Sequence, residues 1–137
     1  MAQKCLYGFG KNVSLDFDSA VARAEHLLLK HGFQVYTRLM VQDIVGSKLS
    51  SVFGRYIILG ACNPAFAEEL FQADPDIGLM IPCNFVIYEL PEDGCRVMIK
   101  DPARMMDLIQ KPMAIQASMG IKEQMEQIID DFMDEHA

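Results

Sequence analysis

The stretch RYIILGACNPAFAEELF, residues 55–71, places a strand signal directly before a helix signal and so decides how the fold is read. Its first half is a short apolar run that ends in a cysteine, which is typical of a buried strand. Asn63 and Pro64 then mark a helix start, because asparagine caps helix N-termini and the missing N–H of proline costs nothing at the first helical position. We therefore predict a strand over 55–62 and a short helix over 63–71.

The residues before this stretch predict two more strands and two more helices. LYGFGKNVSL, residues 6–15, is expected to form one strand whose middle is loosened by glycine. Asp16 can cap a helix that the His–Gly pair at 31–32 ends, because glycine readily adopts the left-handed conformation found at helix C-termini. A strand over 33–41 and a short helix over 42–54 complete this half of the chain.

The residues after the stretch predict a hairpin and two helices. A fourth strand is expected over 79–90, and Pro82 within it indicates an edge strand or a bulge, because proline cannot donate to a sheet ladder. A PEDG turn leads to a fifth strand over 95–100, which gives a hairpin. Helices are expected over 101–110 and from Pro112 onward, the second with an amphipathic stripe.

The order of these elements, β-α-β-(α)-β-(α)-β-β-α, is typical of an α+β fold. We predict a largely antiparallel sheet with helices packed on one face, and the inserted helices are expected to be short. The length of 137 residues indicates a single domain over 1–137, and the apolar share of 51% excludes a disordered chain.

Charge and hydropathy limit the partners and the location of the chain. The formal net charge is −7 and no basic stretch exceeds two residues, so we expect neither nucleic acid nor an anionic membrane surface as a partner. No apolar run approaches the roughly 18 residues that a membrane span needs, and the N-terminal MAQKCLYGFG lacks the apolar core of a signal peptide. We therefore expect a cytoplasmic protein.

A homodimer is expected from the same composition. Over half of the residues are apolar. The glycine-interrupted first strand and the strand that contains Pro82 offer edges at which a second strand can pair. The expected macromolecular partner is therefore a second copy of the chain.

Cys62 and Cys83 are the candidate site residues. The four cysteines form no Cys-x-x-Cys pair and lack zinc-site spacing, so free thiols are expected. Cys62 precedes the helix cap Asn63, where unpaired N–H groups would lower its pKa and make it the most reactive thiol; the alternative is a packed, inert thiol. Cys83 and Asn84 repeat the Cys-Asn pair. If the third and fourth strands are neighbours, both thiols lie near one another at one end of the sheet.

Lys48 is a further candidate, because a lysine close to a thiolate would stabilise the anion. It lies among apolar residues in the helix expected over 42–54. The alternative is a surface lysine whose methylene stem covers its apolar neighbours.

The chain resembles, over four segments, the family known as domain of unknown function 302. The segments are GFGKNVSLDFDSAVARAEHLLLKHGFQV, YIILGACNP, ADPDIGLMIPCNFVIYE and KDP, within a region from about Tyr7 to Asp131. The resemblance implies a TATA-binding-protein-like fold with a β-α-β4-α core, and dimers. It also places Cys62 and Cys83 at matched positions and a lysine near Lys48. It implies no reaction, because the biochemistry of the family is not established.

Three functions are consistent with these residues. The first is a ligand-binding or sensing domain for a small molecule or a soft metal ion such as Cu(I) or zinc, with the two thiolates as the metal ligands. Its site residues would be Lys48, Cys62, Asn63, Cys83 and Asn84. The second is a thiol enzyme or redox protein with Cys62 as nucleophile or sulfur acceptor and Cys83 as resolving thiol, for which no general base is evident. The third is a structural homodimer with inert core cysteines, and the sequence identifies neither a cofactor nor a reaction.

Overall fold

The computed structural model describes the backbone of residues 2–134 and the side chains of this range other than 2–4, 105, 106, 133 and 134. Within this range the strands are β1 (Ala2–Cys5), β2 (Gly8–Val13), β3 (Gln34–Met40), β4 (Tyr56–Cys62), β5 (Cys83–Glu89) and β6 (Cys95–Lys100). The helices are α1 (Phe17–Lys30), α2 (Gln42–Val45), α3 (Pro64–Ala73), α4 (Pro102–Ile109) and α5 (Pro112–Asp134), and η1 (Pro75–Met80) is a 3-10 helix.

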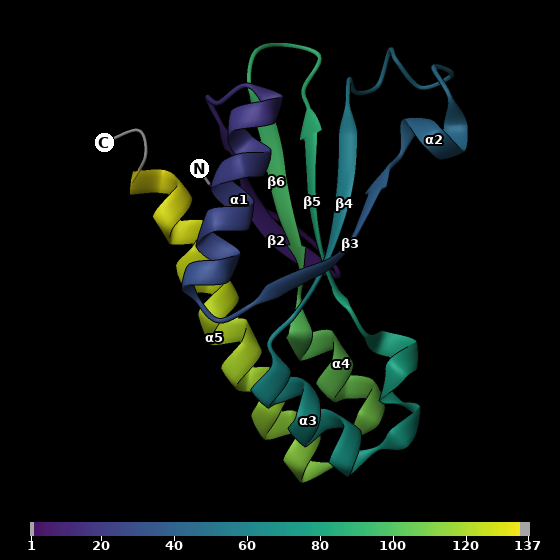
Figure 1. The fold of residues 1–137 in the computed structure, drawn as a ribbon, viewed down its shortest axis with the longest axis vertical. Helices are drawn as coiled ribbons and strands as arrows, with labels where there is room; N and C mark the ends of the chain where they lie inside the picture. The colour runs from purple at the N-terminus through teal and green to yellow at the C-terminus, as the bar shows by residue number, and fades with distance from the viewer. Residues whose placement is uncertain (1, 135–137) are drawn as a thin grey trace.

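The strands form a single antiparallel sheet in the order β1-β2-β6-β5-β4-β3 (Figure 1). Each strand pairs with its neighbour in the opposite direction, and β2 and β6 are neighbours although they are far apart in the sequence. The predicted α+β fold with an antiparallel sheet is confirmed. The strand predicted over 55–62 and the helix that follows it also appear, as β4 and α3.

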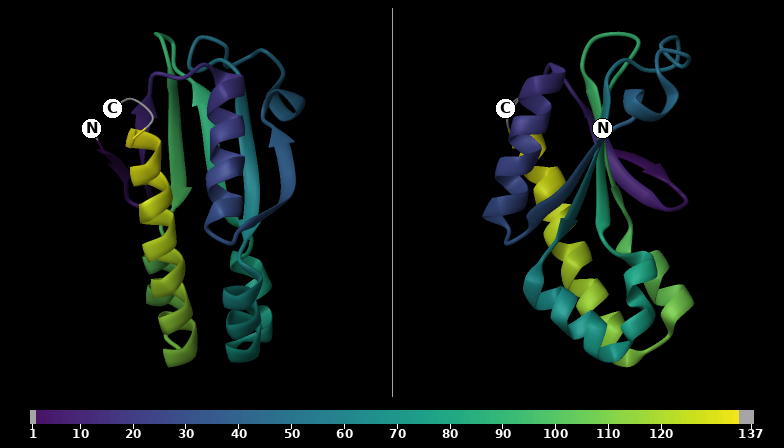
Figure 2. Two further views of the ribbon diagram at one scale, coloured as in Figure 1. Left: turned by 60° about the vertical axis from the view of Figure 1, so that its left-hand side comes forward. Right: turned by 45° about the vertical axis from the view of Figure 1, so that its right-hand side comes forward.

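α1 and α5 cover one face of the sheet, as the right-hand view of Figure 2 shows, while the β1–β2 hairpin projects to the other side. The predicted packing of helices on one face is therefore confirmed. α3, η1 and α4 gather beyond the strand ends at the bottom of Figure 1, where α3 and α4 pack against the first half of α5. No helix in the described range is both long enough and apolar enough to cross a membrane.

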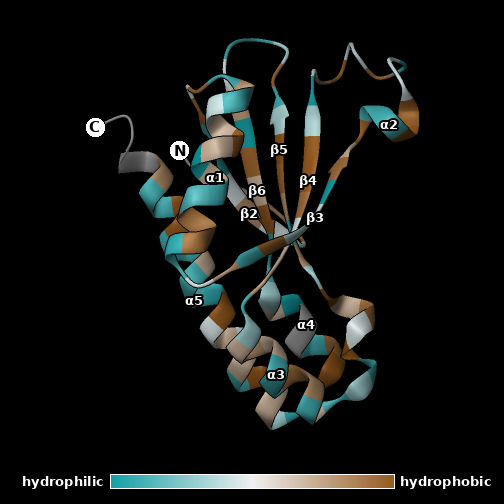
Figure 3. Ribbon diagram, in the orientation of Figure 1, coloured by the Kyte–Doolittle hydropathy of each residue, from teal (hydrophilic) through white to brown (hydrophobic). Residues whose placement is uncertain are grey.

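Alternation along the strands decides which side chains enter the core. In β4, Ile57, Leu59 and Ala61 are buried beneath the helices, and the residues between them face the other way. Phe85 of β5 meets Phe132 of α5 with ring centroids 6.1 Å apart. Figure 3 shows β4 almost wholly in apolar colours, as expected for a strand inside a sheet.

The N-terminal region forms a hairpin and not the single strand predicted over 6–15. β1 pairs with β2, with Cys5 opposite Gly8, and Leu6 and Tyr7 make the turn between them. Apolar patterning did not reveal β1, because its ladder hydrogen bonds to the edge of β2, rather than a buried face of its own, hold it in place.

The helix predicted over 42–54 is much shorter in the structure. α2 ends at Val45, and Gly46 follows with a positive φ of 61°, a conformation that an α-helix cannot continue. The residues from there to the start of β4 form turns and irregular backbone. Lys48 therefore lies outside any helix.

The strand predicted over 79–90 begins only at Cys83, because the residues before it belong to η1 and to the short link that contains Pro82. β5 lies between β4 and β6 in the sheet. Of the two alternatives predicted for Pro82, the edge strand was therefore wrong, and Pro82 makes no bulge within β5 because it lies before the strand begins. A proline just before a strand removes no hydrogen bond from the ladder, so it can precede even a central strand.

Candidate functional site

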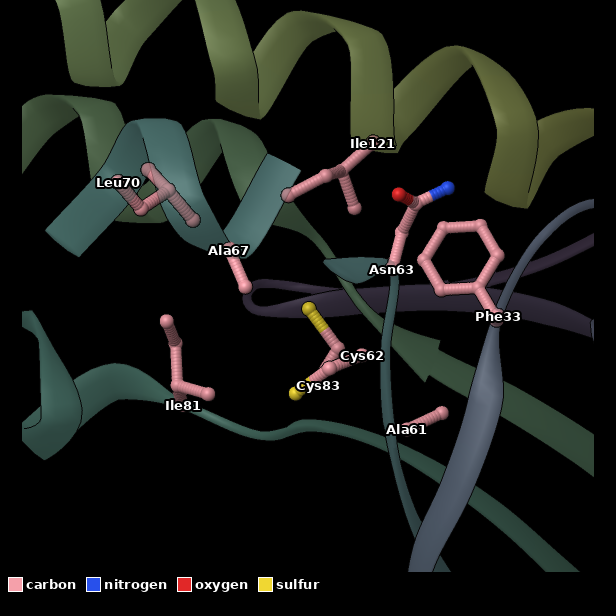
Figure 4. A pocket seen from close by; sticks show the side chains of 9 residues that line it. All are labelled: Phe33, Ala61, Cys62, Asn63, Ala67, Leu70, Ile81, Cys83 and Ile121. Atoms are coloured by element: carbon pink, nitrogen blue, oxygen red, sulfur yellow. The ribbon is translucent and has the colours of Figure 1, made fainter. Parts of the chain in front are cut away.

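Cys62 and Cys83 lie close together where β4 ends and β5 begins. The two strands are antiparallel neighbours, and Ala61 is the register partner of Cys83, so Cys62 is only one residue further along. Both thiols line one cavity between the end of the sheet, α3 and α5, and Figure 4 shows both sulfur atoms directed toward it. The third and fourth predicted strands are therefore neighbours, and the two thiols lie at the same end of the sheet.

The cavity is small and mostly apolar. Its volume is about 10 Å³, which is close to the space of a single water molecule. Apart from the two thiols, its walls are Phe33, Ala61, Asn63, Ala67, Leu70, Ile81 and Ile121. A ligand of several atoms has no room between these side chains.

Burial dominates the electrostatics of both thiols. Burial raises the pKa of Cys62, and a hydrogen bond with the Cys83 backbone and the charge of Lys100 only partly offset this effect. Burial also raises the pKa of Cys83, again against the charge of Lys100. Both groups are therefore thiols and not thiolates near neutral pH.

Lys100 is the cation near the thiols, and the sequence reasoning missed it. Its ammonium group donates to the carbonyl oxygens of Met80 and Pro82, the latter at 3.5 Å, in the segment that leads into Cys83. Lys100 ends β6, which pairs with β5, so the strand register brings it to this end of the sheet. Lys100 begins the KDP segment through which the chain resembles its family, so the sequence did mark this residue. A short segment does not, however, reveal which residues of a neighbouring strand it approaches.

Lys48 does not approach the cysteines. It is exposed and follows α2, which begins just after the end of β3 at Met40. Met40 is opposite Ile57 whereas Cys62 is opposite Gln34, so α2 and the thiols lie at opposite ends of β4 (Figure 1). This placement corrects the expectation that Lys48 stabilises a thiolate.

Asn63 is a helix cap, as predicted. Its side-chain oxygen accepts hydrogen bonds from the backbone N–H groups of Ala65 at 3.0 Å and Phe66 at 3.4 Å. These two N–H groups therefore already have a hydrogen-bond partner. Burial raises the pKa of Cys62, whereas its position before the helix predicted a lowered pKa. Because Cys5 is exposed and Cys62 is only partly so, the structure gives no reason to single out Cys62 as the most reactive thiol.

Asn84 lies on the opposite side of the sheet from the cavity. Successive residues of a strand point to opposite faces, and Cys83 is buried while Asn84 is exposed. Asn84 lines a second pocket, of about 240 Å³, together with Tyr56 and Lys100. The five predicted site residues therefore do not form a single site. Of these five, Cys62, Asn63 and Cys83 line the small cavity, and the other two do not.

The described residues hold no group of three or more His, Cys, Asp or Glu side chains that could bind a metal ion. A four-coordinate zinc site is therefore not supported in this part of the chain, because structural zinc takes four protein ligands. Within the described residues the two thiols therefore have no third ligand of these kinds beside them, and thiolates are the ligands that soft metal ions prefer.

The comparison with family models decides the assignment. The model described as Domain of unknown function DUF302 matches residues 9–132. The chain belongs to the DUF302 family. A crystal structure of an uncharacterized conserved DUF302 protein from Bacillus stearothermophilus is similar, with a TM-score of 0.80 and 20% sequence identity, over 92% of this chain and 98% of that chain. At this identity the likeness shows the shared DUF302 fold alone, and a comparison with curated proteins gave no match.

Proposed function

We propose that this DUF302 protein is a soft-metal-binding domain, suited to sensing, that holds one Cu(I) ion between Cys62 and Cys83. The observation that supports the proposal is that two thiols from neighbouring strands line one cavity of about 10 Å³. Thiolates are soft ligands that select Cu(I) over hard cations. A single ion is also the kind of ligand for which this cavity has room.

The charge balance of the site favours a monovalent ion. Two thiolates and one Cu(I) ion carry a net charge of −1, and Lys100 lies near enough to offset part of the burial that raises the pKa of both thiols. On binding, each S–H bond is replaced by an S–Cu bond and two protons leave, so no oxidation state changes. The ammonium group can then stabilise the anionic copper dithiolate.

The other functions considered for the cysteines have less support. A thiol enzyme needs a thiolate nucleophile, but burial raises the pKa of Cys62. A small molecule between the cysteines finds no room in the cavity. A cytoplasmic location, as expected from the sequence, would keep the thiols reduced and available to Cu(I).

Anaerobic titration with Cu(I) in competition with the chelator bathocuproine disulfonate tests this proposal. We expect the wild-type chain to remove one equivalent of Cu(I) from the coloured chelator complex. Cys62→Ser and Cys83→Ala should each lose this binding, because one thiolate leaves the ion without its second soft ligand. Cys95→Ala is the matched control: Cys95 is also buried, but it begins β6 at the other end of the sheet, so this variant should bind as the wild type does.

X-ray absorption of the loaded protein should show two sulfur neighbours around copper. Equal copper binding by the wild type and Cys62→Ser, or equal loss in Cys95→Ala, would refute the proposal. Reversible loss of two titratable thiols on mild oxidation, without copper binding, would instead favour the redox alternative, in which Cys62 and Cys83 form a disulfide.

We also propose that the protein forms a homodimer through β3. This strand is an edge of the sheet, and its Tyr36 and Leu39 side chains are 57% and 41% exposed. Unpaired strand edges readily pair with another chain. Light scattering should give twice the mass of one chain, and Leu39→Lys should lower it, whereas Leu108→Lys on the exposed surface of α4 should not. A single-chain mass for the wild type at micromolar concentration would contradict the dimer.

A further inference from the structure

The face of the sheet away from α1 and α5 holds a second pocket, which neither Cys62 nor Cys83 lines. Its volume is about 240 Å³, against about 10 Å³ for the cavity at the two cysteines. The pocket is therefore large enough for a small organic molecule, in contrast to the cavity at the two cysteines. Its lining differs in polarity from one end to the other.

One end of this pocket is cationic. Lys100 and Asn84 lie across from one another, one residue beyond the Phe85–Ile99 register pair. Lys100 donates to two backbone carbonyl oxygens, and among the residues that the structure describes it forms no ion pair with a carboxylate. An ammonium group has three donors, so one remains for a ligand. Gly8, which is opposite Lys100 on β2, places no side chain over it.

The other end of the pocket is apolar and aromatic. Val86 and Met98 are register partners and occupy the next position on the same face of β5 and β6. Tyr56 lines the pocket beyond them. Its ring is stacked on Tyr88 with centroids 4.8 Å apart and planes 14° apart, which holds the aromatic wall in place.

We propose that this pocket binds a small amphipathic carboxylate. Its anionic head meets Lys100 and Asn84, and its apolar or aromatic body lies along Val86 and Met98 toward Tyr56. Among the described residues Lys100 has no carboxylate partner, and this cation at one end and the apolar strip at the other complement such a molecule. Ligand pockets of this kind, mostly apolar with a few placed polar groups, are the usual form in proteins.

An NMR titration with 4-phenylbutyrate tests the proposal, because this probe carries a carboxylate at one end and a phenyl ring at the other. We expect shifts in the backbone ¹H–¹⁵N signals of Asn84, Val86, Met98 and Lys100. The neutral analogue 4-phenylbutyramide has nearly the same shape but no charge. The affinity of this analogue should be lower by about tenfold or more, the range expected for loss of a hydrogen bond between charged groups.

Two variants of the cationic end separate binding from folding. Lys100→Met should weaken 4-phenylbutyrate binding by about tenfold or more. Asn84→Asp should weaken it similarly, because it adds a negative charge beside Lys100 and leaves the carbonyl contacts of the lysine intact. Lys48→Met, an exposed lysine at the other end of the sheet, is the matched control and should change nothing. Cys62→Ser should also bind the probe normally, which keeps this test independent of copper.

The proposal is overturned if 4-phenylbutyrate and its amide bind equally, or if the shifted signals lie outside the pocket. It is also overturned if Asn84→Asp binds the carboxylate as tightly as the wild type. Should Lys100→Met fail to fold, the Asn84→Asp result decides, because that variant keeps the shape of the side chain and the contacts of Lys100.

Discussion

Replacing Gly10 by alanine is expected to unfold the protein or to lower its free energy of unfolding by roughly 3 kcal/mol or more. A Cβ atom on Gly10 would lie 2.8 Å from Met98 Cα and still closer to the Val97 carbonyl oxygen. Both are backbone atoms of the neighbouring strand, so no side-chain rotation can relieve the overlap. β2 lies between β1 and β6, and a shift of β2 would therefore disturb both ladders.

Chemical denaturation followed by circular dichroism measures this loss. Gly78→Ala is the matched control, because its Cβ would lie 3.7 Å from the nearest atom of Phe71, an ordinary contact. We expect that variant to change the free energy of unfolding by no more than about 0.5 kcal/mol. Wild-type stability in Gly10→Ala would contradict the close approach of β2 and β6.

Phe132→Ala is expected to lower the free energy of unfolding by about 3–5 kcal/mol, the range for truncating a buried aromatic side chain. Phe132 is fully buried in the second half of α5, and its ring lies 6.1 Å from that of Phe85. The contact fixes this end of α5 on the sheet. Since domains of this kind are stable by only about 5–15 kcal/mol, the variant should be marginally folded at best.

Thermal and chemical denaturation of the variant give this value directly. Met119→Ala is a control in the same helix, because Met119 is 59% exposed and its truncation removes little buried surface. It should leave the stability within about 0.5 kcal/mol of the wild type. A loss in Phe132→Ala as small as in this control would show that α5 does not pack on the sheet as the structure has it.

The sequence alone determined the elements whose signals are local. Asn63 and Pro64 predicted the start of α3, and Asp16 predicted the start of α1, where its side chain accepts a hydrogen bond from Ser19. Each signal lies within one helical turn of the feature that it specifies, so no distant contact was needed to interpret it. The amphipathic stripe predicted after Pro112 likewise indicated the helix that covers the sheet.

Local patterns failed where pairing or backbone conformation decided the outcome. β1 forms because its backbone pairs with β2, and the sequence of residues 2–5 does not indicate that pairing. The helix predicted over 42–54 stops at Gly46, whose positive φ the apolar spacing could not reveal. β5 starts after Pro82 and lies inside the sheet, since the position of a strand among its neighbours is not encoded in the strand itself.

The candidate sites depended on the tertiary structure even more. The sequence supplied Cys62 and Cys83, but only the antiparallel register of β4 and β5 brings them to one cavity. The pairing of β5 with β6 places Lys100 near them, and the pairing of β3 with β4 leaves Lys48 at the other end of the sheet, because proximity between strands follows from their order and direction. The position of Cys62 just before a helix predicted a lowered pKa, whereas burial raises the pKa of this thiol. Burial depends on what packs around a thiol, and residues far away in the chain supply that packing.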